Sequence, residues 1–267
     1  YGADCIIFDL EDAVSVYEKD AARDLVCEYL KACRPNCRVG IRINGQDTPY
    51  HEEDVKALVP LKPDFLRLPK SESAKNIQDL DNLLTKYETE NNIEPGTIKI
   101  AATIETALGV YNAYEIATAS PRMFAIGLGA EDFRADMRMV RSEDAEEILF
   151  ARNQISLCAH AAKVIPMDYV NSNFQDPEGF KKDVAFGKKL GYTCKSCIHP
   201  NQIALVHEVY TPTDKEIAHA KRVVEVYKEA MANGSGAIAL DGKMIDMPIV
   251  LRAKATLEYA VASGKEV

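Results

Sequence analysis

Short apolar runs alternate with longer amphipathic stretches along most of the chain. The short runs are rich in Ile, Val, Leu and Phe, and in the stretches between them apolar residues recur at helical spacing. Buried parallel strands followed by amphipathic helices produce this pattern, so the sequence predicts a parallel sheet of strand–helix units. The predicted strands are residues 5–10, 39–43, 65–68, 98–104, 123–128, 167–170 and 193–198.

The predicted helices include residues 18–32, 71–87 and 142–163, the last beginning at a cap-like Ser142. A parallel sheet of this size either stays open as a doubly wound sheet or closes as an eight-stranded barrel. The length of 267 residues fits one TIM-type (β/α)8 barrel, which takes about 250 residues. We therefore predict an α/β barrel, and because only seven strands are visible we expect a first strand and helix ahead of Tyr1 in the complete protein.

A C-terminal extension follows the barrel pattern, which ends near Tyr210. We assign residues 1–210 to the barrel and 211–267 to the extension. The extension predicts a long helix over 213–231, a glycine-rich segment at 233–236, a short apolar run over 237–240, a turn at Asp241-Gly242 and a last helix from Pro248. It is too long to be a simple barrel cap, so we expect it to form an oligomer interface and to complete a neighbouring active site.

Composition narrows the class of protein. The chain is 47% hydrophobic and 27% charged, which is ordinary for a globular domain, and its net charge of -9 argues against nucleic acid as a partner. No apolar run approaches the roughly 20 residues that cross a membrane, so we predict a cytoplasmic protein. Seven cysteines suit a reducing compartment, and Cys194 and Cys197 lie in a predicted strand whose geometry points them to opposite faces.

Polar residues that end the predicted strands are the candidates for chemistry, because a parallel barrel builds its active site at the carboxyl ends of its strands. Glu105 and Asp132 follow adjacent strands, and paired carboxylates of this kind suit Mg2+. The alternative is chance, since 41 acidic residues place some at strand ends in any case. The full set is Asp9, Glu11, Asp12, Arg42, Asn44, Arg67, Lys70, Glu105, Glu131 and Asp132.

Arg42 lies in an otherwise apolar strand, and a buried guanidinium requires an anion. Two interpretations stay open: an internal salt bridge with a strand-end carboxylate, or a fork for a substrate carboxylate or a developing enolate. The sequence has no HExxH, GxSxG or P-loop motif, and Gly127-Leu128-Gly129 lacks the third glycine of a dinucleotide site. His199, before Pro200 at a strand end, has two interpretations: a side chain facing the site, or a capping or packing residue, which we favour.

Six motifs together resemble the citrate lyase β-subunit family, within the larger group of HpcH/HpaI-type aldolases and malyl-CoA-type lyases. Each motif alone is modest, but six in the same order are specific, and the resemblance runs over essentially the whole chain. The motifs are IFDLEDAV at 7–14, RIN at 42–44, RLPK at 67–70, IETALG at 104–109, GAED at 129–132 and GKMIDMP at 242–248.

The resemblance implies roles for particular residues. It implies Mg2+ held by Glu105 and Asp132, and Asp246 reaching from the extension into a neighbouring subunit's site as the acid/base residue of a trimer. Taken alone, Asp246 reads as a capping residue ahead of the Pro248 helix. Arg42 would be catalytic and, with Glu105, would contact the substrate. Gly129, Ala130 and Glu131 would also line the substrate. Glu11 and Asp12 would contact and orient the residues that bind the metal and the substrate.

The resemblance also implies a reaction and partners: cleavage of a citryl thioester into oxaloacetate and an acetyl thioester. The thioester would be carried by an acyl carrier protein subunit and loaded by a citrate:acetyl-ACP transferase subunit. Four lysines of one predicted helix, Lys181, Lys182, Lys188 and Lys189, form either a docking patch for the carrier or a solvated face. Alternatives are a stand-alone citramalyl-CoA or malyl-CoA lyase, an aldolase acting on free 2-oxo acids, and a non-catalytic scaffold.

Overall fold

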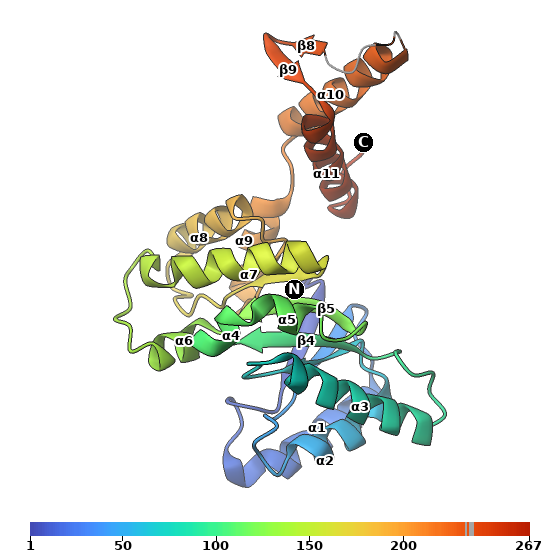
Figure 1. Cartoon of the computed structure of the whole chain (residues 1–267), viewed down its shortest axis with the longest axis vertical. Coiled ribbons are helices and arrows are strands. Elements are labelled where there is room, and N and C mark those ends of the chain that lie inside the picture. Colours follow the sequence, from blue (N-terminus) through green and yellow to red (C-terminus); the bar gives the residue numbers. More distant parts are fainter. Residues whose placement is uncertain (233, 235–237) are drawn as a thin grey trace.

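A computed structural model describes residues 1–232, 234 and 238–267 (Figure 1). Seven parallel strands form one curled sheet in which each strand pairs with the next along the chain, so the predicted α/β barrel class is confirmed. The strands are β1 (Cys5–Asp9), β2 (Arg38–Arg42), β3 (Phe65–Leu68), β4 (Lys99–Ile104), β5 (Met123–Leu128), β6 (Ile165–Asp168) and β7 (Cys194–Lys195).

Helices cover the outer face of this sheet (Figure 1). Their apolar stripes pack on outward-facing strand residues such as Ile41, Leu66 and Ile126, all fully buried. A second, small cluster that includes Phe65 and Ala101 fills the inner face. The barrel helices are α1 (Lys19–Ala32), α2 (His51–Leu58), α3 (Ala74–Glu90), α4 (Ala107–Tyr111), α5 (Ala113–Ala117), α6 (Ala130–Asp136), α7 (Leu149–Ala162), α8 (Pro177–Lys189) and α9 (Pro200–Tyr210).

Several predicted elements have different bounds in the structure. The helix expected from Ser142 is α7 and begins only at Leu149, because the Ser142 hydroxyl binds Glu147 and the Glu146 amide and closes a turn instead. The helix expected over 71–87 is α3, which begins after Ser73 in a capping box with Asn76. The seventh strand is also shorter than predicted.

The extension forms a small unit with its own core. It contains α10 (Asp214–Ala232), an antiparallel hairpin of β8 (Ile238–Leu240) and β9 (Lys243–Ile245), and α11 (Met247–Ala262). The predicted long helix, turn and last helix are therefore present, with Asp241 and Gly242 both at positive φ as a tight hairpin turn requires. Of the glycine-rich segment 233–236 and the start of the run 237–240, only Gly234 lies within the described residues.

Figure 1 shows the extension standing apart from the barrel, connected to it after α9. Its core joins α10, the hairpin and α11 through apolar side chains such as Val223, Leu240 and Val250. Among the described residues, no helix is long and apolar enough to cross a membrane. All seven cysteines are free.

Candidate active site

Strand register brings several candidate side chains onto the inner face of the barrel. Arg42 of β2 and Arg67 of β3 are paired in register, so both point the same way. On β4, Ala101 belongs to the inner cluster, and Thr103 and then Glu105 follow at intervals of two residues. Since side chains alternate along a strand, Thr103 and Glu105 face the barrel interior beside the two arginines.

Arg42 is held by a cluster of carboxylates. Its Nε and Nη2 donate to the two oxygens of Asp9 at 2.7 and 2.6 Å, and Nη1 lies 2.8 Å from Glu11 and 3.3 Å from Asp12. Burial acts to raise the pKa of Asp9, but the hydrogen bonds from Arg42 outweigh it and lower that pKa. The structure therefore shows an internal salt bridge at Arg42, and a contact of Arg42 with substrate stays a prediction.

Glu105 is buried beside Asp132 with only 1% of its surface exposed. One carboxylate oxygen accepts a long hydrogen bond of 3.4 Å from the Lys70 amide, and the other, Oε2, has no hydrogen-bond partner in the described part of the chain. Burial, followed by the neighbouring Asp132, raises the pKa of Glu105 to about 8. Among the described residues, no Lys, Arg or His side chain forms an ion pair with this carboxyl group.

Glycine at position 129 permits this crowding. A Cβ at Gly129 would lie 2.5 Å from Cγ of Glu105, so a larger residue would push α6 away from β4. Asp132 lies in the first turn of α6, where it is exposed. The side chain of Glu131 instead turns to Arg134 and Arg141, at 2.9 and 3.1 Å, so we expect any contact of Glu131 with a ligand to come from its backbone.

The residues around Glu105 fit a divalent cation. Five carboxyl groups and three cations meet here, which leaves a formal charge of -2 when all are ionised. The described residues contain no group of three or more His, Cys, Asp or Glu placed to bind a metal alone. Mg2+ needs only one or two protein carboxylates and takes its other ligands from water and substrate, so Glu105 and Asp132 suffice.

Asp246 is not brought together with these residues. It precedes α11, and its carboxylate accepts a hydrogen bond from the Ile249 amide at 3.4 Å. The predicted capping role is therefore confirmed, as is that of His199, which caps α9. Since Asp246 lies between β9 and α11, it belongs to the extension that stands apart from the barrel in Figure 1.

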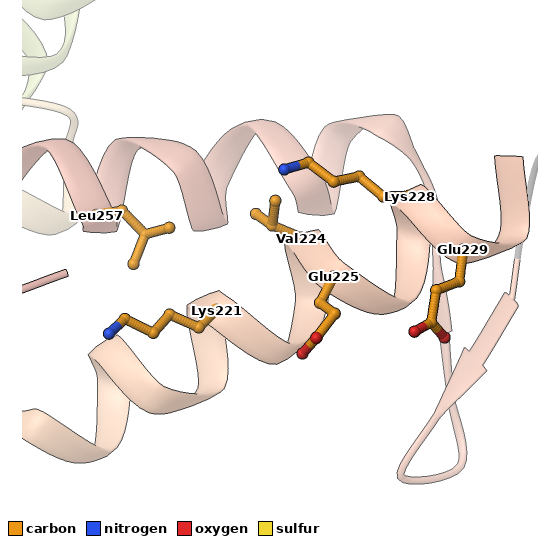
Figure 2. A pocket seen from close by; sticks show the side chains of 6 residues that line it. All are labelled: Lys221, Val224, Glu225, Lys228, Glu229 and Leu257. Carbon is orange, nitrogen blue, oxygen red and sulfur yellow. The ribbon is translucent and has the colours of Figure 1, made fainter. Parts of the chain in front are cut away.

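Two hollows in the described surface lie away from Glu105 and Arg42. One, of about 430 Å³, lies on the extension between α10 and α11, where Val224 and Leu257 point toward each other among charged side chains (Figure 2). The other, of about 590 Å³, lies at the amino ends of the strands and includes Arg34, Lys62 and Phe124. Neither contains a predicted site residue.

A buried charged network at the ends of β6 and β7 was missed by the sequence analysis. Lys195 lies 3.0 Å from Asp168 and 2.7 Å from Asp183, and Arg152 binds both of these carboxylates. The strand-end rule that selected Glu105 did not find it, because these strands were predicted over 167–170 and 193–198, whereas Asp168 ends β6 and Lys195 ends β7.

Comparison with known proteins identifies relatives along almost the whole chain. The family model described as HpcH/HpaI aldolase/citrate lyase matches residues 1–200. Citrate lyase subunit beta of Leuconostoc mesenteroides subsp. cremoris is 46% identical, over 98% of this chain and 87% of that protein. Human mitochondrial citramalyl-CoA lyase is 31% identical, over 97% of this chain and 79% of that protein.

A solved structure of similar fold supports the same family. The crystal structure of protein CitE from Mycobacterium tuberculosis in complex with magnesium, acetoacetate and coenzyme A is 30% identical, with a TM-score of 0.81 over 97% of this chain and 90% of that chain. A barrel with paired carboxylates at its strand ends and relatives of this kind defines a carbon–carbon lyase. The chain belongs to the HpcH/HpaI aldolase/citrate lyase family.

Proposed function

We propose that the protein cleaves a citryl thioester into oxaloacetate and an acetyl thioester, with Mg2+ held by Glu105 and Asp132. The observation that carries this proposal is the buried Glu105 oxygen, which has no hydrogen-bond donor within the described residues and lies beside a second carboxylate. A buried carboxyl in this state requires a proton or a cation. The similarity to citrate lyase β subunits supports the choice of acyl group.

The reaction makes three demands on the site. The tertiary hydroxyl loses its proton, the bond from its carbon to the methylene next to the thioester breaks, and the electron pair moves to the thioester carbonyl as an enolate. The methylene carbon of that enolate then takes up a proton to give the acetyl thioester. When bound, Mg2+ supplies positive charge that lowers the hydroxyl pKa and orients the adjacent carboxylate.

The protein's own residues meet the remaining demands. Arg42 supplies a permanent positive charge for the oxygen that gains electron density, and its fork on Asp9 fixes its orientation. Asp246 transfers the proton to the departing methylene carbon. Because Asp246 lies on the extension, we assign it to the site of a neighbouring subunit in a trimer, with residues 1–210 as catalytic barrel and 211–267 as the contributing extension.

The proposed partners are an acyl carrier protein subunit and a citrate:acetyl-ACP transferase subunit. Similarity to a protein named as a subunit of citrate lyase supports a multi-subunit complex. Of the four α8 lysines, Lys181 pairs with Glu178 and Glu208, and Lys188 donates to the Val209 carbonyl. Lys182 and Lys189 are exposed and are the better candidates for docking an acidic carrier.

A second candidate function is cleavage of a coenzyme A thioester by the free enzyme. It is favoured by the citramalyl-CoA lyase relative and by the coenzyme A in the neighbouring crystal structure. The chemistry at Glu105, Asp132 and Arg42 is the same in both cases. The two functions differ in the carrier of the acyl group and, for a citramalyl-CoA or malyl-CoA lyase, in the acyl group itself.

Oxaloacetate release from carrier-bound and CoA-bound citryl thioesters tests the proposal. We expect release that depends on Mg2+, with kcat/KM lowered at least about a hundredfold in Glu105→Gln. Glu115→Gln, a matched change of an exposed residue on α5, should behave as the parent chain. Release that persists without Mg2+, or in Glu105→Gln, would contradict the proposal. The thioester with the higher kcat/KM identifies the carrier of the acyl group.

A further inference from the structure

Arg67 is unusual among the arginines of this protein. Its Nε donates to the Thr103 hydroxyl at 2.6 Å, and within the described residues its guanidinium forms no ion pair with a carboxylate. The other arginines that are buried or partly buried all form at least one ion pair: Arg23, Arg42, Arg122, Arg134 and Arg152. A guanidinium inside a barrel without a carboxylate partner is costly unless a ligand supplies the anion.

The surroundings of Arg67 increase the need for an anion. Arg42 is its register partner on β2, so two guanidinium groups project from adjacent strands into the same interior. Burial and the charge of Arg42 lower the pKa of Arg67, while Glu105 acts in the opposite direction. Arg42 already has Asp9 and Glu11 as partners, so the unbalanced charge lies on Arg67.

Position relative to Glu105 indicates which anion fits. Thr103, which holds the Nε of Arg67, lies on β4 two residues before Glu105, the residue that directly follows this strand. Same-face neighbours along a strand are about 7 Å apart, a separation spanned by a metal–oxygen bond and a four-carbon diacid. A substrate would bind the cation at Glu105 through its own hydroxyl group and the carboxylate next to that hydroxyl. Its second carboxylate then points toward Arg67.

We propose that Arg67 is the specificity residue for the acyl group, binding the second carboxylate of the acid fragment: the one that oxaloacetate carries and that pyruvate and glyoxylate lack. This inference rests on the proposed function and deepens it. The Thr103 contact leaves both terminal nitrogens of Arg67 to form a bidentate pair with that carboxylate. A citramalyl or malyl thioester offers no such group, so binding it buries Arg67 without an anion, which disfavours these substrates.

Substrate preference in Arg67→Met tests this role. Citryl and citramalyl thioesters, which differ by a carboxymethyl against a methyl group, are compared on the carrier that the parent chain uses. We expect kcat/KM for the citryl thioester to fall about a hundredfold while that for the citramalyl thioester is unchanged or rises. Arg34→Met, a change of an exposed arginine at the amino ends of the strands, should leave the ratio of the two unchanged.

Arg67→Lys keeps the positive charge but not the two parallel N–H donors of the guanidinium. We expect the ratio of kcat/KM for the citryl thioester to that for the citramalyl thioester to fall about tenfold. Arg67→Lys serves as the second variant should Arg67→Met fold poorly, which thermal unfolding reports. Equal losses for both thioesters, or an unchanged ratio, would overturn the inference, since a purely structural arginine affects both alike.

Calorimetry separates failure of this inference from failure of the proposed function. Oxaloacetate and pyruvate are titrated into the parent chain and Arg67→Met, each with Mg2+. We expect the parent to bind oxaloacetate more tightly and the variant to lose most of that preference. A parent chain that cleaves neither thioester defeats the proposed function, yet a preference lost in the variant still supports Arg67. Equal binding of both acids by the parent would overturn the assignment of Arg67.

Discussion

At the scale of single residues, Glu105 stands out as a buried carboxyl group with an unpartnered oxygen among the described residues. Burial, followed by the neighbouring Asp132, raises the pKa of this carboxyl group to about 8. In an unfolded chain the same group has its ordinary pKa of about 4.5. Between these two values the folded protein binds a proton that the unfolded chain has lost.

Stability without metal should therefore fall as pH rises from about 5 to about 8, because the folded state must give up the Glu105 proton at a cost. Thermal unfolding over this range measures the fall, and Mg2+ should reduce it by replacing the proton. In Glu105→Gln, which has no such proton, the fall attributable to this residue should vanish. An identical pH dependence in the parent and the variant would contradict the assignment.

At the scale of elements, the network at the ends of β6 and β7 connects four parts of the barrel. Asp168 ends β6, Lys195 ends β7, Asp183 comes from α8 and Arg152 from α7. The Lys195 and Asp168 side chains are each only 1% exposed. Two carboxylates thus balance two cations inside the protein, and removing one cation leaves a buried charge unpaired.

Lys195→Met should lower the free energy of unfolding by about 3–5 kcal/mol, because Asp168 and Asp183 then share only Arg152. Urea denaturation measures this loss. Lys182→Met, the same substitution on the exposed side of α8, is the matched control and should leave the midpoint where it is. A small loss in Lys195→Met would mean that the carboxylates take up protons and that the network contributes little.

The elements were the most predictable part of the structure. The apolar runs of β1 to β5 identified both the strands and their order, because near-continuous apolar runs are typical of parallel strands buried on both faces. The predicted start of α7 was wrong. Whether Ser142 caps a helix or closes a turn depends on which neighbouring group its hydroxyl binds, and in the structure that group is Glu147.

The candidate site was only partly predictable. The rule that parallel strands end at the active site selected Glu105, Asp132 and Arg42, but it does not state which side chains meet. The Arg67–Thr103 contact depends on the register between β3 and β4, which the sequence does not specify. Asp246 came from a family resemblance, because by its own sequence context it is a helix cap.

At the scale of the whole molecule, the extension and the barrel each present apolar surface. Met244, Met247 and Leu251 are 63%, 46% and 57% exposed around the start of α11, where Asp246 lies. On the barrel, Phe150 and Leu157 of α7 are also exposed. Apolar surface of this kind on both parts is expected of a chain that assembles with copies of itself.

If Asp246 acts in a neighbour's site, two inactive variants should complement each other. Asp246→Asn is the suitable partner for Glu105→Gln, because asparagine still caps α11 and only the acid/base function is lost. In cyclic oligomers assembled from an equal mixture, about a quarter of the sites combine an intact Glu105 with an intact Asp246. We therefore expect unfolding and refolding of the mixture together to restore about a quarter of the parent activity.

The matched control pairs Glu105→Gln with the double variant that carries both substitutions. No site in that mixture can contain an intact Glu105, so it should remain inactive after the same treatment. Recovery in the first mixture alone requires that one subunit supply the metal carboxylates and another the acid/base residue. A first mixture that stays inactive, with its oligomers shown to have exchanged subunits, would place Asp246 in its own subunit's site or remove it from the reaction.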